Sequence, residues 1–92
     1  MRTIYQDAVR ETLSACRAVR ENTMDVERFQ NLLWDIADRV SSADEKLLRE
    51  RLRYFEGRIE LARFTHDDRE VRGEIERILD EVELFLRTIL EE

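Results

Sequence analysis

The chain has no proline and only two glycines among its 92 residues, together with one cysteine and one histidine. A glycine-rich turn that could cradle a phosphate is therefore missing. The single cysteine, Cys16, excludes an internal disulfide and any metal site built from several cysteines, so the chain is not typical of small secreted scaffolds. We expect a protein of the reducing cytoplasm.

Long apolar runs are missing as well. No stretch approaches the ~20 consecutive apolar residues that span a membrane, and the first residues, MRTIYQDAVRETL, lack the apolar core of a signal peptide. Apolar residues make up 42% of the chain and charged residues 41%, which is too apolar for disorder and more charged than an average domain. At this length, the composition predicts a single domain over residues 1–92, built from long helices with narrow buried faces.

Positive charge is the scarcer sign, since 16 Lys and Arg residues stand against 22 Asp and Glu residues and the net charge is −6. The acidic total argues against a dedicated nucleic-acid binder. The charge is uneven, because residues 46–63 are rich in arginine and residues 74–92 are rich in acids. Antiparallel packing would set these two segments against each other. Alternatively, part of the first segment could contact nucleic-acid phosphates through Arg49, Arg51, Arg53 and Arg58.

Apolar residues recur at steps of three and four along most of the chain, which is the period of an α-helix. Asp25 is placed to cap the second helix, and either Thr65 with Asp68 or Asp67 with Glu70 can cap the last one. The pattern predicts four helices, at about residues 3–21, 25–41, 43–64 and 67–90.

The third predicted helix is apolar across nearly half of its circumference. One row consists of Leu48, Leu52, Phe55, Ile59 and Ala62. A second row, about 100° away around the helix, consists of Leu47, Tyr54 and Leu61. One row can pack on the following helix, so the other needs a second partner. We therefore expect this helix to lie centrally in the bundle.

Two serines, Ser41 and Ser42, stand between the second and third predicted helices. Ser42 with Glu45 forms a capping-box pattern, which favours a turn. Against a turn, an apolar residue recurs every seven positions straight through the serines, which fits one continuous helix over residues 25–64. We predict an all-α, antiparallel four-helix bundle with a turn at Ser41–Ser42; the alternative is three helices, one of them spanning residues 25–64.

Residue types that serve catalysis or metal binding are scarce or badly placed. The acids of the last predicted helix mostly fall off its apolar stripe, so a buried dinuclear metal site is not predicted. The only histidine, His66, adjoins Asp67 and Asp68, where a weak surface metal site is the alternative to helix capping. Cys16 lies on an apolar face and is expected to be a buried, inert thiol. We predict no enzymatic activity, no cofactor and no metal ion.

Several large apolar residues fall off the predicted stripes, which indicates a surface that another chain covers. These candidate interface residues are Leu13, Leu32, Trp34 and Leu84. Closed two-fold dimers are the commonest oligomers, so we predict a homodimer. The alternative is a monomer in which wide apolar faces wrap the core and Trp34 lies against a neighbouring helix.

The function that remains is a small acidic protein–protein interaction module of the cytoplasm that acts through exposed helix faces. It would be an adaptor, a chaperone-like protein, or an immunity-like or antitoxin-like neutraliser. An acidic surface would speed the encounter with a basic partner, although the sequence does not specify that partner. The alternative function is a helical regulator that contacts nucleic acid through the arginine-rich third helix.

Overall fold

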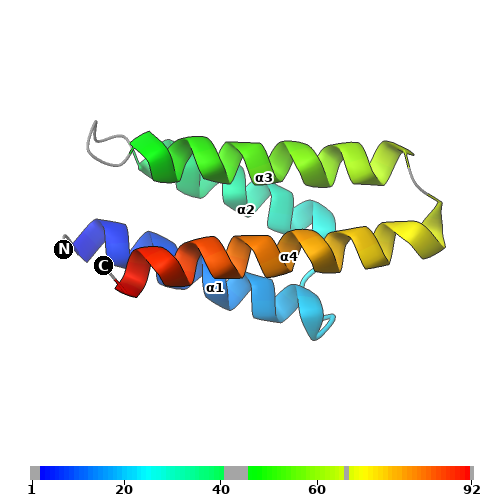
Figure 1. Ribbon diagram of the computed structural model, residues 1–92, viewed down its shortest axis with the longest axis horizontal. Helices are drawn as coiled ribbons and strands as arrows, with labels where there is room; N and C mark the ends of the chain where they lie inside the picture. The colour runs from blue at the N-terminus through cyan, green and yellow to red at the C-terminus, as the bar shows by residue number, and fades with distance from the viewer. Residues whose placement is uncertain (1–2, 41–45, 66, 92) are drawn as a thin grey trace.

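The computed structural model describes residues 3–40, 46–65 and 67–91, which form four α-helices packed against one another (Figure 1). The helices are α1 (Thr3–Arg20), α2 (Val26–Arg39), α3 (Lys46–Thr65) and α4 (Asp68–Glu91). The prediction of an all-helical fold with four helices is therefore confirmed. Within the described ranges, none of the helices combines the length and the apolar character that crossing a bilayer requires.

The end of α2 decides between the two predicted topologies. α2 ends at Arg39, and Val40 leaves the helical conformation with φ −88° and ψ 81°, while its N–H still donates to the Ile36 carbonyl. α3 begins at Lys46. The alternative of one continuous helix over residues 25–64 is therefore wrong. The predicted turn at Ser41–Ser42 lies outside the described residues.

Side-chain caps start two of the helices as the sequence predicted. The Asp25 carboxylate accepts a hydrogen bond from the backbone N–H of Arg28 at 2.7 Å, at the start of α2. The Asp67 carboxylate accepts from the backbone N–H groups of Arg69 and Glu70, at 3.0 and 2.9 Å, at the start of α4. Each cap satisfies N–H groups that have no partner within their own helix. His66, the other member of the possible surface metal site, lies outside the described residues.

Each helix packs on two others, so that α1 and α3 both contact α2 and α4. In Figure 1, α3 and α4 lie side by side in front of α2 and α1, along the 40 Å axis of the molecule. Arg63, near the end of α3, reaches Glu27 at the start of α2. Arg53, in the first half of α3, reaches Asp38 near the end of α2. The expected central position of α3 is wrong, because α3 is one of four corners.

The core is formed by apolar side chains from all four helices. Its largest fully buried members are Val9, Phe29, Leu33, Ile36, Val40, Leu48, Leu52, Ile59, Ile78, Leu79, Val82 and Leu86. Phe85 follows the apolar spacing of α4 but is only partly buried. Its ring lies 6.1 Å from the ring of Phe55, at the border between α4 and α3.

Candidate functional site

Helix α3 has two rows of mostly large apolar side chains, one of which is buried in the structure and the other exposed. The inner row, Leu48, Leu52, Phe55, Ile59 and Ala62, is buried against α2 and α4. The outer row consists of side chains that are at least half exposed: Leu47 (61%), Tyr54 (50%), Leu61 (62%) and Phe64 (80%). Within the described chain, no helix packs over this row, so the surface it forms is the candidate site.

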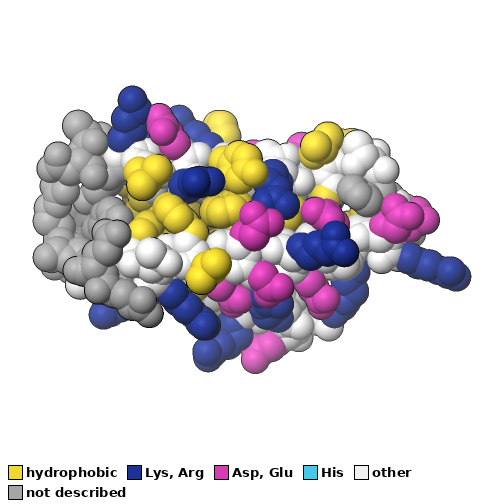
Figure 2. Space-filling model, in the orientation of Figure 1, with side chains coloured by type: hydrophobic (Ala, Val, Ile, Leu, Met, Phe, Trp, Pro, Cys, Tyr) yellow, Lys and Arg dark blue, Asp and Glu magenta, His cyan; other side chains and the backbone are white. Residues whose placement is uncertain are grey.

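The outer row follows a heptad spacing. Leu47, Tyr54 and Leu61 lie seven residues apart, and Phe64 lies three residues after Leu61. Positions related in this way form one stripe along a helix, the stripe that a second helix covers in a coiled coil. Figure 2 shows apolar side chains gathered over α3 and over its border with α4, with charged side chains of both signs among and around them. The site is therefore an apolar ridge with charged flanks.

The arginines of α3 are largely engaged within the chain. Arg49 donates to the Val40 carbonyl at 3.0 Å, at the end of α2. Arg53 donates to Asp38 at 3.1 Å. These two side chains, which the sequence offered as nucleic-acid contacts, thus hold α2 and α3 together.

Arg58, the third of these arginines, binds α4. It donates to Glu81 at 2.6 Å and lies 3.7 Å from Glu74, and the hydrogen bond to Glu81 is the main cause that raises the pKa of Arg58. Arg51 differs, since no carboxylate of the described residues lies within ion-pair distance of it. Its guanidinium lies 5.7 Å from the ring centroids of both Tyr54 and Phe85. Arg51 is thus a cation on the edge of the outer row, in contact with aromatic faces.

The predicted interface residues lie on three different helices. Leu13 of α1 and Leu32 of α2 are partly buried and pack against the core. Trp34 of α2 is 48% exposed, and the guanidinium of Arg53 lies 5.2 Å from its ring centroid. Leu84 of α4 is 70% exposed. These four residues were predicted because they depart from the apolar stripes of their helices. Phe64, which continues the outer row at a regular spacing, was not predicted.

A buried polar group joins α2 to α3 beside this surface. The Gln30 amide nitrogen donates to Glu56 at 3.0 Å and to Glu60 at 2.7 Å. The Gln30 oxygen accepts from Arg63 at 2.5 Å. Gln30 is buried, and both ends of its amide are satisfied. This cluster therefore positions α3 on α2.

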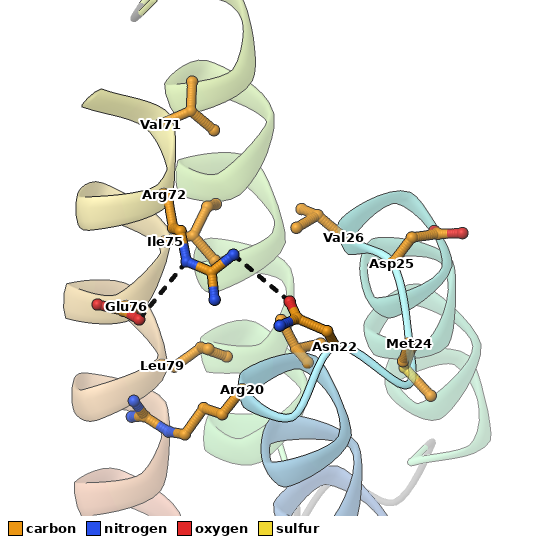
Figure 3. A pocket seen from close by; sticks show the side chains of 11 residues that line it. Arg20, Asn22, Met24, Asp25, Val26, Val71, Arg72, Ile75, Glu76 and Leu79 are labelled. Carbon is orange, nitrogen blue, oxygen red and sulfur yellow. Dashed lines mark hydrogen bonds and ion pairs between the residues drawn. The ribbon is translucent and has the colours of Figure 1, made fainter. Parts of the chain in front are cut away.

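A hollow of about 360 Å³ lies at the other side of the bundle, between the α1–α2 turn and the first turns of α4 (Figure 3). Arg72 lies between Asn22, at 3.4 Å, and Glu76, at 4.0 Å. Arg20 is held by Glu83 and Asp80, and the hydrogen bond to Glu83 is the main cause that raises the pKa of Arg20. The apolar side chains that line the hollow are Val19, Met24, Val26, Val71, Ile75 and Leu79. With its arginines already engaged, the hollow offers mainly apolar contact.

The described part of the chain offers few side chains suited to catalysis or metal binding. Cys16 is fully buried, and burial, followed by the Glu83 carboxylate, raises the pKa of its thiol to about 12. No group of three or more His, Cys, Asp and Glu side chains is arranged to hold a metal ion among residues 3–40, 46–65 and 67–91.

No family model matches the chain, and no curated protein or solved structure matches it either.

Proposed function

We propose that the chain is a small, non-catalytic protein–protein interaction module of the cytoplasm. It acts through the outer row of α3, and it self-associates as a homodimer of antiparallel four-helix bundles. The modules of this kind that suit its size and acidity are adaptors, chaperone-like proteins, and immunity-like or antitoxin-like neutralisers.

The observation that carries this proposal is the exposure of the whole outer row. A single exposed leucine needs no explanation, but four large exposed apolar side chains along one helix indicate a surface that another molecule covers. Burying one such side chain contributes roughly 1.5–3 kcal/mol. A partner helix laid along the row would gain a part of this contribution from each side chain that it covers.

The net charge bears on a partner of another kind. A charge of −6 favours encounter with a basic protein and does not favour a second copy, so the homodimer is supported by the outer row and not by the net charge. The alternative, a regulator that contacts nucleic acid through α3, has less support, because Arg49, Arg53 and Arg58 are held by groups of the same chain. We expect labelled duplex and single-stranded DNA to bind no tighter than about micromolar at physiological salt. Tight binding that weakens steeply with salt and is lost in Arg51→Glu would favour the alternative.

Site-specific photo-crosslinking in the cells that produce the protein tests the proposed function. A benzophenone amino acid replaces Leu61 in the outer row, and in the control it replaces Arg77, an exposed residue of α4. We expect covalent adducts with protein from position 61 and few from position 77. Equal yields from the two positions, or none from position 61, would contradict the proposal.

A further inference from the structure

Gly57 lies in the outer face of α3, between Tyr54 and Leu61, where a glycine has no role in the single chain. A Cβ built on it meets no heavy atom within 4 Å. No glycine of the described residues has a positive φ, so the backbone conformation does not require one either. Glycine weakens a helix interior relative to alanine. Gly73 of α4 is equally uncrowded, but of the two glycines Gly57 is the one that lies in the outer face of α3, where a glycine permits close approach by another molecule.

We propose that this molecule is a second copy of the chain, and that two α3 helices dock antiparallel with Tyr54 of each copy seated on Gly57 of the other. The two-fold axis then lies at the height of the midpoint between residues 55 and 56 of each α3 helix. This inference rests on the proposed function, since it names the partner and the register of the homodimer.

The spacing of the outer row is self-complementary about that axis. Moving outward, Tyr54 comes opposite Gly57, which places the largest side chain near the centre on the smallest residue. At the ends, Leu47 comes opposite Phe64. A two-fold axis makes each of these contacts twice, as an isologous interface requires. The heptad spacing keeps the contacts on one stripe over the length of α3.

The remaining pair of positions is compatible with this register. Leu61 comes opposite Glu50, whose carboxylate lies 3.8 Å from the Lys46 ammonium of its own helix. The methylene groups of Glu50 are then free to cover Leu61 while the charge stays at the edge.

The flanking charges favour the same arrangement. Arg51, which has aromatic rings beside it, comes level with residue 60 of the second copy. Nearby on that copy, Arg58 holds the carboxylates of Glu74 and Glu81. Arg51 can therefore share these carboxylates across the interface, a charge-assisted contact that no described residue of its own chain offers it.

A parallel pair lacks these features. Each residue would then face its own counterpart, so Tyr54 would meet Tyr54 and Gly57 would meet Gly57. The first contact crowds two rings and the second leaves a gap, which costs the dispersion contacts of the lining atoms. Glu50 would also face Glu50, which adds like-charge repulsion.

Substitution of the two glycines gives the first test. Gly57→Leu places a branched side chain where Tyr54 of the second copy would lie, and the open space around Gly57 in the single chain leaves room for it. Gly73→Leu is the matched control, because Gly73 is also helical, exposed and uncrowded. By light scattering at micromolar concentration, we expect wild type and Gly73→Leu near twice 11.1 kDa and Gly57→Leu near 11.1 kDa, with equal helix content by circular dichroism. A monomeric wild type, or a Gly57→Leu dimer, overturns the inference.

Spin-label distances give a second test, on a chain that keeps Gly57. Single cysteines replace Lys46 and Thr65, which are equally far from the proposed axis, and buried Cys16 stays unlabelled because its thiol pKa is about 12. At a rise of 1.5 Å per residue, both sites should give a distance of about 30 Å between copies. A parallel pair would give about 10 Å at both sites. Two unequal distances would mean either a shifted register or an interface on another part of the surface. A parallel result and an unequal result each overturn the inference.

The two sets of results separate the inference from the proposed function. Purified protein that stays monomeric, together with adducts to other proteins from position 61 in cells, removes the inference and leaves the interaction module. A dimer that survives Gly57→Leu removes the register and leaves the homodimer. A monomer without adducts from position 61 removes both.

Discussion

The inner and outer rows of α3 both consist mainly of large apolar side chains that recur along one face of the helix, but only the inner row is covered. α2 and α4 flank the inner row and bury it completely. The outer row faces solvent, and Arg51 lies across the rings at its α4 edge. The outward face of α4 is different again, since Leu84 is the only large apolar side chain that is exposed there within the described residues. Helix α3 therefore has more apolar surface than its own fold buries, and this exposed apolar surface distinguishes it from α4.

Thiol reactivity should show the largest contrast between the buried interior and the outer row. At pH 8 a thiol with a pKa of 9.0 is about one-tenth thiolate, whereas Cys16, with its pKa of about 12, is about one ten-thousandth thiolate. We expect Leu61→Cys to react with a maleimide about 1000-fold faster at position 61 than at Cys16. The rate at Cys16 should rise about tenfold for each pH unit from pH 8 toward pH 12, because the thiolate fraction does so. Similar rates at the two cysteines would contradict the burial of Cys16.

Truncation of the inner row should have the largest effect on stability. Leu52 is fully buried, so Leu52→Ala removes its apolar contacts and leaves a cavity. We expect the free energy of unfolding to fall by about 2–5 kcal/mol, measured by urea denaturation followed by circular dichroism. A loss of under ~1 kcal/mol would mean that the inner row is not core.

Much of this fold could be predicted from the sequence, because burying a stripe imposes the helical period on it. The pattern located four helices, and capping residues located the starts of two. Periodicity alone does not tell the centre of a wide stripe from its edge, as Phe85 of α4 shows, because it follows the apolar spacing and is only partly buried. Neighbouring helices decide that, and α3 lies beside Phe85.

The candidate site was harder to predict for a related reason. The sequence shows both rows of α3 with equal clarity, and only the positions of α2 and α4 determine which row stays exposed. The sequence predicted that a second partner would cover the row of Leu47, Tyr54 and Leu61. The predicted interface residues were chosen because they departed from regular spacing, so Phe64, which continues this row, was overlooked. A glycine in that row becomes informative only once the structure shows the space around it, and the space around Gly57 is open.

The polar border between α2 and α3 should give an intermediate effect on stability. Gln30→Met keeps the length of the side chain but removes the donor that Glu56 and Glu60 share and the acceptor that Arg63 uses. We expect the free energy of unfolding to fall by about 1–3 kcal/mol at pH 7. Its three partners are partly solvated, and water replaces some of what they lose, which favours the lower half of this range. Gln30→Met with unchanged stability in urea denaturation would show that the cluster is not needed to hold α3 on α2.

The smallest effect is expected in the outer row, provided that the protein is dilute. Leu61→Ala removes a side chain that is 62% exposed in the single chain, so it leaves no cavity there. Below the concentration at which the chain self-associates, we expect the free energy of unfolding to change by less than about 0.5 kcal/mol, as for other surface substitutions. At higher concentration the wild type should gain stability from association, because a partner that binds only the folded state stabilises it by mass action. Leu61→Ala should gain less, since it has lost part of the covered row. Thermal unfolding of both proteins over a hundredfold range of concentration measures this difference: curves that stay parallel would show that the outer row takes no part in association, whereas curves that diverge as concentration rises assign it to the interface.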